Sequence, residues 1–272
     1  MNTALFSLIV TLFQWQSSPP DTLLIPFLAT APTIDGNLNE WKHQAFHDGE
    51  WDIFRVSHTA WYEPSRNRLT QHGSEDLLEN DLSARYYMAW DSAYLYLAAE
   101  VTDNRNDIIP HKPEPFRWYY KDAIAWFIES PADDNSETFG EGDHGFAFVA
   151  DPTQPANGAW WRHGTADSTY LEEPIPAEAV EYRISGMAGF PETTGSYTLE
   201  ARISLALTMG RNNPGWKPPQ QGEHWRMMIV HCDPDGGDYG GHLLIYGKGD
   251  DDQTWMPAVL AGEKIAPERR ER

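Results

Sequence analysis

The stretch Asp81–Asp103, DLSARYYMAWDSAYLYLAAEVTD, decides the fold of this chain. In its first half the apolar residues Tyr86, Met88 and Trp90 alternate with their neighbours, which is the period-two pattern of a half-buried β-strand. In its second half both alternating sets are largely apolar, so we expect both faces of that strand to be covered. The DSA triplet between the halves favours a turn, because Asp and Ser side chains bond to their own backbone. The stretch therefore predicts a central β-hairpin that ends in an acidic loop at Asp103.

Further segments of the chain show strand-like patterns and are separated by connections rich in Gly, Pro, Asp and Asn. They are Leu23–Leu28, Lys121–Glu129, Phe146–Ala150, Ala159–Arg162, Glu178–Ser185, Tyr197–Ile203, Trp225–Cys232 and His242–Tyr246. Many short strands with turns between them predict an all-β fold, an antiparallel β-sandwich of the jelly-roll or immunoglobulin-like type with long loops. Gly49–Asn80 shows little periodicity and is predicted to be one of those loops.

One or two short helices complete the predicted fold. Asn39 is a good capping residue for a helix from Glu40 to Ala45, and a second short helix is expected near Leu205–Met209. Asp35-Gly36 is expected to form a tight turn.

Composition excludes several classes of partner. The formal net charge of −21 would repel nucleic acid and anionic membranes, whereas it suits neutral ligands and bound cations. Cys232 is the only cysteine, so no intrachain disulfide is possible. We expect a monomer.

The N-terminus has the pattern of a signal peptide. An apolar run from Ala4 to Phe13 is too short to span a bilayer, and small polar residues follow it up to Ser18. We therefore expect a signal peptide over residues 1–18, a single domain over 23–265, a charged tail over 266–272, and a secreted or periplasmic protein.

A series of motifs resembles the family 9 carbohydrate-binding modules. In chain order these are PTIDGNLNEW (32–41), AWD with LYLAAEVTD (89–103), KDAIAWFIES (121–130), DHGFAFVAD (143–151), SYTLEARISLALT (196–208) and EHWRMMIVHCDPDGG (223–237). The resemblance extends over residues 31–262. It implies a solitary exported β-sandwich that binds a polysaccharide or oligosaccharide without catalysis and supports glycan degradation or uptake.

The resemblance also implies a sugar site built on loop aromatics. In the family two Trp side chains sandwich a terminal sugar, and the matching positions here are Trp118 or Tyr119, ahead of a strand, and Trp255, near the C-terminus. Trp160 and Trp161 are additional candidates.

The polar part of the family's sugar site does not carry over. Ala125 stands where the family has Glu, and Phe148 and Ala150 stand where it has Arg and Asn. Sugar hydroxyls need fixed hydrogen-bond partners for orientation and specificity, so these three positions count against the family's reducing-end specificity and against sugar binding itself.

Acidic loops offer oxygen ligands of the kind that calcium prefers. The candidate metal ligands are Asp103, after the hairpin, and Asp233, Asp235 and Asp238 in DPDGGDYGG. Acidic residues also gather before the strand at Asp143 and in the run Asp250–Asp252. The family holds structural calcium ions, so the resemblance implies calcium as a cofactor.

Three alternatives remain open at the level of the sequence. Related sandwiches hold b-type haem for electron transfer through Met, His or Lys, and this chain has Met88, Met187, Met227 and Met228 with several His, although no spacing selects a pair. A glycosidase would need two carboxylates across a cleft, which the sequence does not locate. A surface or glycoside hydrolase accessory module with no small ligand of its own is the third.

Overall fold

The structure, a computed structural model, describes most of the chain. The described residues are 22–43, 51–52, 59–63, 68–71, 82–103, 118–133, 139–151, 158–165, 167, 169–186, 195–211, 213, 215–233, 241–245 and 251–263. The predicted signal peptide and the charged tail lie outside them.

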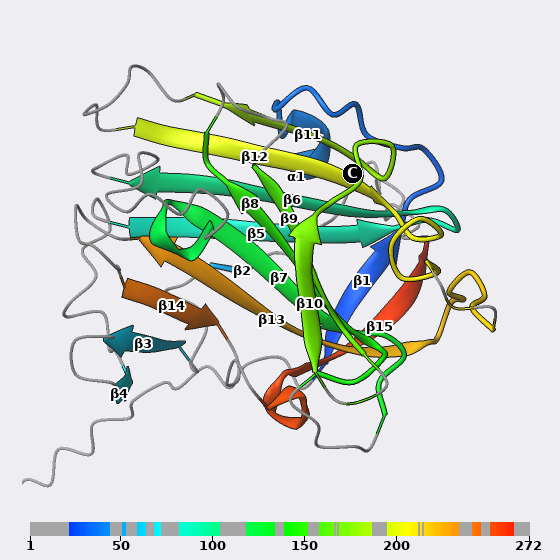
Figure 1. The fold of residues 1–272 in the computed structure, drawn as a ribbon. Coiled ribbons are helices and arrows are strands. Elements are labelled where there is room, and N and C mark those ends of the chain that lie inside the picture. The colour runs from blue at the N-terminus through cyan, green and yellow to red at the C-terminus, as the bar shows by residue number, and fades with distance from the viewer. Residues whose placement is uncertain are drawn as a thin grey trace, which may run out of the picture.

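The described elements are almost all strands (Figure 1). They are β1 (Leu23–Phe27), α1 (Asn39–His43), β2 (Trp51–Asp52), β3 (Thr59–Glu63), β4 (Arg68–Gln71), β5 (Leu82–Trp90), β6 (Tyr94–Asp103), η3 (Trp118–Tyr120), β7 (Ala123–Glu129), β8 (Asp143–Val149), β9 (Ala159–Gly164), β10 (Tyr170–Pro174), β11 (Val180–Ser185), β12 (Gly195–Ser204), β13 (His224–Asp233), β14 (Gly241–Ile245), η5 (Asp252–Thr254) and β15 (Met256–Glu263). No helix among these residues is long and apolar enough to cross a membrane. The predicted all-β class is confirmed.

The strands join into one continuous sheet with the order β10-β9-β8-β7-β13-β15-β1-β5-β6-β12-β11. The short strands pair off this path: β2 pairs with β5, β14 pairs with β13, and β3 pairs with both β14 and β4. Two pairings are parallel, β1 with β15 and β1 with β5, so the prediction of a purely antiparallel arrangement is wrong. The cause is that β1 and β15, from opposite ends of the chain, meet side by side in the middle of the sheet (Figure 1).

The predicted central hairpin is confirmed. β5 and β6 pair antiparallel, with Trp90 opposite Leu95. Asp91 builds the turn, because its Oδ1 accepts hydrogen bonds from the backbone N–H groups of Ala93 and Tyr94, both at 2.7 Å. Its Oδ2 accepts a further bond from the hydroxyl of Tyr96 at 2.6 Å. The turn is therefore fixed by one aspartate, as the residue type suggested.

The inner face of the hairpin packs against the other half of the sheet. Tyr86 of β5 meets Trp126 of β7 edge to face, with ring centroids 6.3 Å apart. Phe148 of β8 meets Tyr182 of β11 at 5.4 Å. Because these partners belong to distant positions in the strand order, the sheet curls and its two halves enclose one hydrophobic core.

The outer face of the hairpin is covered by the segment that contains α1. Leu28, Ile34, Leu38 and Trp41 form a second buried cluster with Tyr87, Ala89, Tyr96 and Ala98 of the hairpin. This explains why both alternating sets of β6 are apolar, and it confirms that both faces of that strand are covered.

A buried carboxylate holds this covering segment in place. Glu200 of β12, which is fully buried, accepts hydrogen bonds from the indole N–H of Trp41 at 2.6 Å and from the backbone N–H of Gly36 at 2.9 Å. Gly36 has a φ of +83°, and a Cβ there would collide with Ser185, so glycine is required at this turn. Burial raises the pKa of Glu200, and these hydrogen bonds act in the opposite direction.

Two local expectations from the sequence are wrong, and one strand was not predicted. The predicted loop Gly49–Asn80 contains β2, β3 and β4, which form because β14 and β5 supply distant partners. The helix expected near Leu205–Met209 is a series of turns. The edge strand β10 was not foreseen, because its residues show no period-two burial.

The helix predicted from Glu40 to Ala45 corresponds to α1 as far as His43, beyond which the chain is not described.

We predict that Trp90→Ala strongly destabilises the fold. Trp90 is buried, meets Phe27 edge to face at 5.1 Å, and donates a hydrogen bond from its indole N–H to the carbonyl of Ala261 at 3.1 Å. Removing it should lower the free energy of unfolding by about 3–5 kcal/mol, measured by urea denaturation. Leu207→Ala, at an exposed apolar position, is the control and should change it by no more than about 0.5 kcal/mol. Equal effects of the two changes would contradict a core role for Trp90.

Candidate functional sites: an aromatic cluster, a cavity and two groups of carboxylates

The first candidate region is an aromatic cluster around Arg162 of β9. The centre of its guanidinium lies 6.0 Å from the ring of Trp118, 5.8 Å from Phe127 and 4.4 Å from Tyr170. Glu172 of β10 fixes it by accepting hydrogen bonds from Nε at 2.9 Å and Nη2 at 2.6 Å. The guanidinium is thus held by two hydrogen bonds to one carboxylate oxygen, Oε2 of Glu172, and by aromatic faces.

The two predicted platform residues both border this cluster, but neither offers an open face. Trp118 is 4% exposed and Trp255 is 2% exposed. Trp255 packs on Phe127 at 5.9 Å and on Phe139 at 6.4 Å, and the indole N–H of Trp118 points to Oε2 of Glu172 at 3.3 Å. The expectation of two exposed rings is therefore corrected. Ala125 and Phe127 make this side of β7 apolar, and the two indoles help to cover it.

The remaining aromatic candidates occupy different places. Tyr119 is partly buried and meets Trp118 edge to face at 5.5 Å. Trp160 and Trp161 are neighbours on β9 and are buried on opposite faces of that strand. Only Trp161 borders the cavity described next.

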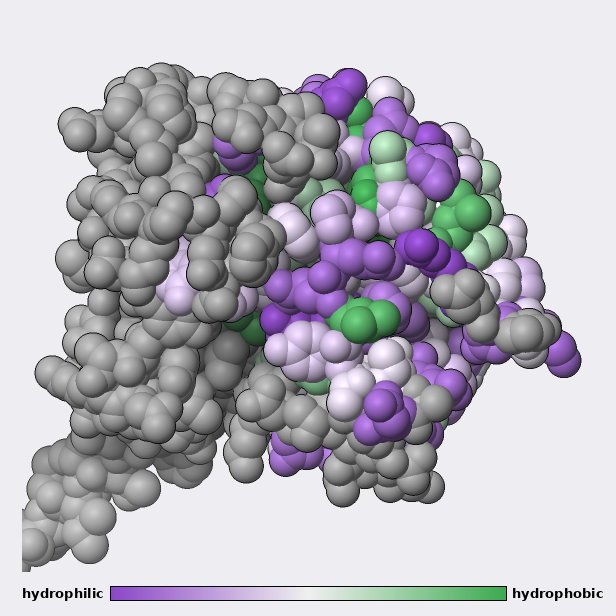
Figure 2. Space-filling view, viewed as in Figure 1, coloured by the Kyte–Doolittle hydropathy of each residue, from purple (hydrophilic) through white to green (hydrophobic). Residues whose placement is uncertain are grey.

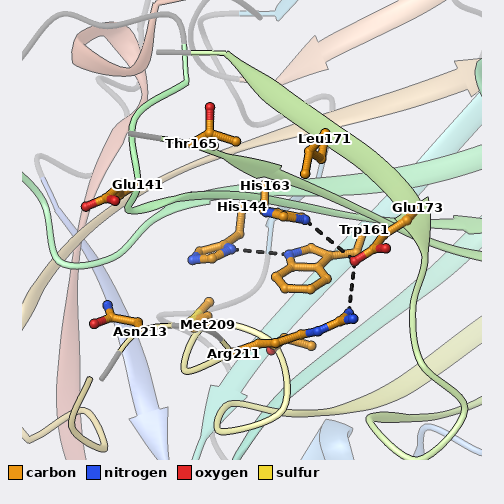
Figure 3. Close-up of a pocket in the computed structure, with 12 residues that line it drawn as sticks. Glu141, His144, Trp161, His163, Thr165, Leu171, Glu173, Met209, Arg211 and Asn213 are labelled. Atoms are coloured by element: carbon orange, nitrogen blue, oxygen red, sulfur yellow. Dashed lines mark hydrogen bonds and ion pairs between the residues drawn. The ribbon is translucent and has the colours of Figure 1, made fainter. Parts of the chain in front are cut away.

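A cavity of about 600 Å³ borders Trp161 and His163 of β9 (Figure 3). Side chains alternate along a strand, so this is the face of β9 opposite Arg162. Strands β8, β9 and β10 form one side of it, and the turns that follow β12 form the other. Its lining comprises Glu141, His144, Trp161, His163, Gly164, Thr165, Leu171, Glu173, Thr208, Met209, Arg211 and Asn213. Of these residues, the sequence predicted only Trp161 as a sugar-binding candidate, because the lining comes from four separate segments of the chain.

The wall of the cavity is a stack of rings. Trp161 donates a hydrogen bond from its indole N–H to Nδ1 of His144 at 3.2 Å, and the ring of His163 stacks on Trp161 with centroids 4.1 Å apart. Burial lowers the pKa of His144 to about 3, with a smaller contribution from His163, so His144 stays neutral and able to accept this bond.

A polar edge borders the same cavity. Oε1 of Glu173 accepts a hydrogen bond from Nη1 of Arg211 at 2.9 Å and lies 3.6 Å from Nε2 of His163, as the dashed lines in Figure 3 show. The second distance is too long for a direct hydrogen bond. Glu173 of β10 therefore lies between His163 of β9 and Arg211 from the turns after β12.

The second candidate site is a group of three buried aspartates. Asp103 at the end of β6, Asp122 before β7 and Asp233 at the end of β13 each offer a carboxylate oxygen, and these oxygens lie within 4.8 Å of one another. The sequence pointed to Asp103 and Asp233 separately, and the structure brings them together with Asp122, which was not foreseen. The other two predicted ligands, Asp235 and Asp238, lie outside the described residues.

A buried network borders these aspartates. A 2.6 Å hydrogen bond joins Oη of Tyr86 to Nδ1 of His231, and Nε2 of His231 lies 3.4 Å from Oη of Tyr197. Burial, with a smaller contribution from Asp122, Asp103 and Asp233, raises the pKa of Tyr197, so the tyrosine stays protonated. His231 is therefore engaged on both ring nitrogens within the core.

A second group of carboxylates lies at the other end of β7. Glu129, Asp143 and Asp252 are all buried, and Arg226 provides one guanidinium, whose Nη1 lies 2.6 Å from Oε2 of Glu129. The backbone N–H of Gly140 donates to Oδ2 of Asp143 at 2.6 Å, while Oδ1 of Asp143 and Oδ1 of Asp252 have no hydrogen-bond partner among the described residues. Burial, together with Asp252, Glu129 and Asp133, raises the pKa of Asp143 to about 7.

Comparison with known proteins gives one family and several similar structures. The model of the family described as carbohydrate family 9 binding domain-like matches residues 55–263. A family 9 carbohydrate-binding module from Caldicellulosiruptor kristjanssonii in complex with cellotriose has a similar fold, with a TM-score of 0.53 and 14% identity over 90% of this chain and 98% of that one. A family 9 module from the same organism in complex with glucose gives a TM-score of 0.53 and 15% identity over the same shares. No curated protein matches.

We predict that the fold loses stability as the pH rises from about 4 to about 7. Because its pKa is raised, Asp143 keeps its proton in the folded protein up to about pH 7, whereas the unfolded chain releases that proton near pH 4. The stability that this proton contributes is therefore fully present in acid and is lost as the pH rises to 7. Asp143→Asn should therefore flatten the pH dependence and be more stable than the wild type at pH 8, by on the order of 1–3 kcal/mol. Thermal melts from pH 4 to 8 measure both effects.

The exposed Glu178 provides the control for this prediction. Glu178→Gln should leave the wild-type pH profile unchanged. If the melting temperature of Asp143→Asn changed with pH in parallel with that of the wild type, Asp143 would not be the group whose protonation causes the pH dependence.

Proposed function

Because the chain belongs to the carbohydrate family 9 binding domain-like family, we propose that it binds a carbohydrate without transforming it. The family match, which extends over most of the chain, is the observation that carries this proposal. The structures with the same fold hold cellotriose and glucose, which supports testing neutral hexose oligosaccharides first. The packing of β5 against β7 across one core supports describing the curled sheet as a β-sandwich.

The pairing of three carboxylates described above supports binding rather than turnover. Glu172 pairs with Arg162, Glu129 pairs with Arg226, and Glu200 accepts bonds from Trp41 and Gly36. Each of these carboxylates is engaged in holding the fold together, whereas a glycosidase keeps two carboxyl groups facing each other across an open cleft.

We propose that calcium is held by Asp103, Asp122 and Asp233. Three buried carboxylates this close repel one another strongly, and a divalent cation would neutralise them. Calcium binds six to eight oxygens, and carboxylates are its preferred protein ligands. The three residues close β6, open β7 and close β13, so a bound ion would tie strands from both halves of the curled sheet together.

We predict that calcium raises the melting temperature of protein from which metal has first been removed with chelator. Binding to the native state alone stabilises it by mass action. At calcium concentrations about 100-fold above Kd the gain should be about 2.7 kcal/mol. Asp122→Asn should reduce this gain, whereas Glu178→Gln should retain it. A melting curve that is the same with calcium and with chelator would rule out the site.

We propose that the protein is exported after removal of residues 1–18, on the strength of the apolar run Ala4–Phe13. N-terminal sequencing of protein from the envelope or medium should then find a start between Phe13 and Asp21. Intact Met1 on cytoplasmic protein would contradict export.

We predict that the mature protein binds neutral oligosaccharides in a glycan array and in calorimetric titrations. The titrations should show saturable heat with at least one of cellotriose, xylotriose and mannotriose, and no release of reducing sugar over the same period. Absence of binding to every glycan, with the fold intact by circular dichroism, would overturn the proposed function. Sustained hydrolysis would replace it with a catalytic one.

A further inference from the structure

We propose that the sugar enters the cavity beside Trp161 and His163, on the face of β9 opposite Arg162, and that Arg211, Glu173 and Leu171 bind it there. This inference rests on the proposed carbohydrate binding and names its site. The ligand is a neutral oligosaccharide, of which one or more rings occupy the cavity.

The first argument is that a cavity borders one face of β9. On the other face, the guanidinium of Arg162 lies against Trp118 and Phe127, and Trp118 itself is buried. On the cavity side, Trp161 is 2% exposed, and the guanidinium of Arg211 lies 5.8 Å from its ring. The cavity measures about 600 Å³, which lies within the ordinary size range of small-molecule sites.

The second argument is the polar edge of the cavity. Nε2 of His163 is buried and has no hydrogen-bond partner among the described residues, and Oε1 of Glu173 lies 3.6 Å from it. Because that nitrogen is buried, the group of this pair that a sugar hydroxyl can reach is the carboxylate of Glu173, whose side chain is 41% exposed. The guanidinium of Arg211 adds donors, since its recorded bond to Glu173 uses only Nη1 and the side chain is 41% exposed.

The third argument is the apolar wall beside these polar groups. Leu171 of β10 is 57% exposed and borders the cavity, so it offers an apolar surface to a ligand there. Thr165 and Asn213 add further hydroxyl and amide groups to the lining, as Figure 3 shows. A pyranose has the matching chemistry, because its ring presents C–H groups on its faces and hydroxyls around its edge.

Neighbouring residues on β10 provide a matched test. Leu171 borders the cavity, whereas Tyr170 lies on the opposite face of the strand over Arg162, with its ring centroid 4.4 Å from the guanidinium centre. Both side chains are exposed, at 57% and 47%, so neither change should prevent folding. Leu171→Ala, Arg211→Ala and Tyr170→Ala are each titrated with cellotriose, xylotriose and mannotriose by calorimetry, and folding is checked by circular dichroism.

The expected result is that Arg211→Ala weakens binding about tenfold, Leu171→Ala about three- to fivefold, and Tyr170→Ala by less than about twofold. Unchanged binding in the Arg211 and Leu171 variants, or a loss in Tyr170→Ala that equals or exceeds theirs, would overturn the cavity as the site while leaving carbohydrate binding intact. Absence of binding in the wild type would overturn this inference together with the proposed function.

Discussion

The structure depends on a hairpin that must be buried on both of its faces. On β6, Leu95, Leu97 and Ala99 face the core between the two halves of the sheet, and Tyr96 and Ala98 face outward to the segment that contains α1. A strand with two apolar faces cannot lie on the surface, so the chain must place one layer on each side of it. The opposite half of the curled sheet provides the first layer, and residues 28–41 provide the second.

Polar groups then fix these layers relative to each other. Glu200 anchors the covering segment through Gly36 and Trp41, and the network of Tyr86, His231 and Tyr197 joins β5 and β12 to β13 across the core. Each buried polar atom in these networks has a partner, as the cost of an unmade hydrogen bond requires. The parallel pairing of β1 with β5 and β15 closes the sheet between its two halves. On the face that Figure 2 shows, the described surface is mostly hydrophilic, with scattered apolar residues.

The two faces of β9 differ in what borders them. On the aromatic side, Arg162 and Glu172 pair with each other, Ala125 is apolar, and Trp118 and Trp255 are buried. The opposite side ends in a cavity whose groups, among them His163, Glu173 and Arg211, combine stacked rings with donors and acceptors. The two groups of carboxylates at the ends of β7 limit the stability of the fold in another way. Buried negative charges repel one another unless a cation or a proton neutralises them.

The sequence by itself determined the all-β class, the β5–β6 hairpin, the Asp35-Gly36 turn and the core role of Trp90, because period-two burial and turn chemistry are local. It also pointed to Asp103 and Asp233 as acidic ends of strands. Only the tertiary structure decided that these two meet Asp122, that Trp118 and Trp255 are buried, and that the cavity combines β8, β9 and β10 with the turns after β12. Each of these facts depends on contacts between segments far apart in the chain, and the curl of the sheet, which no local pattern encodes, sets which segments meet.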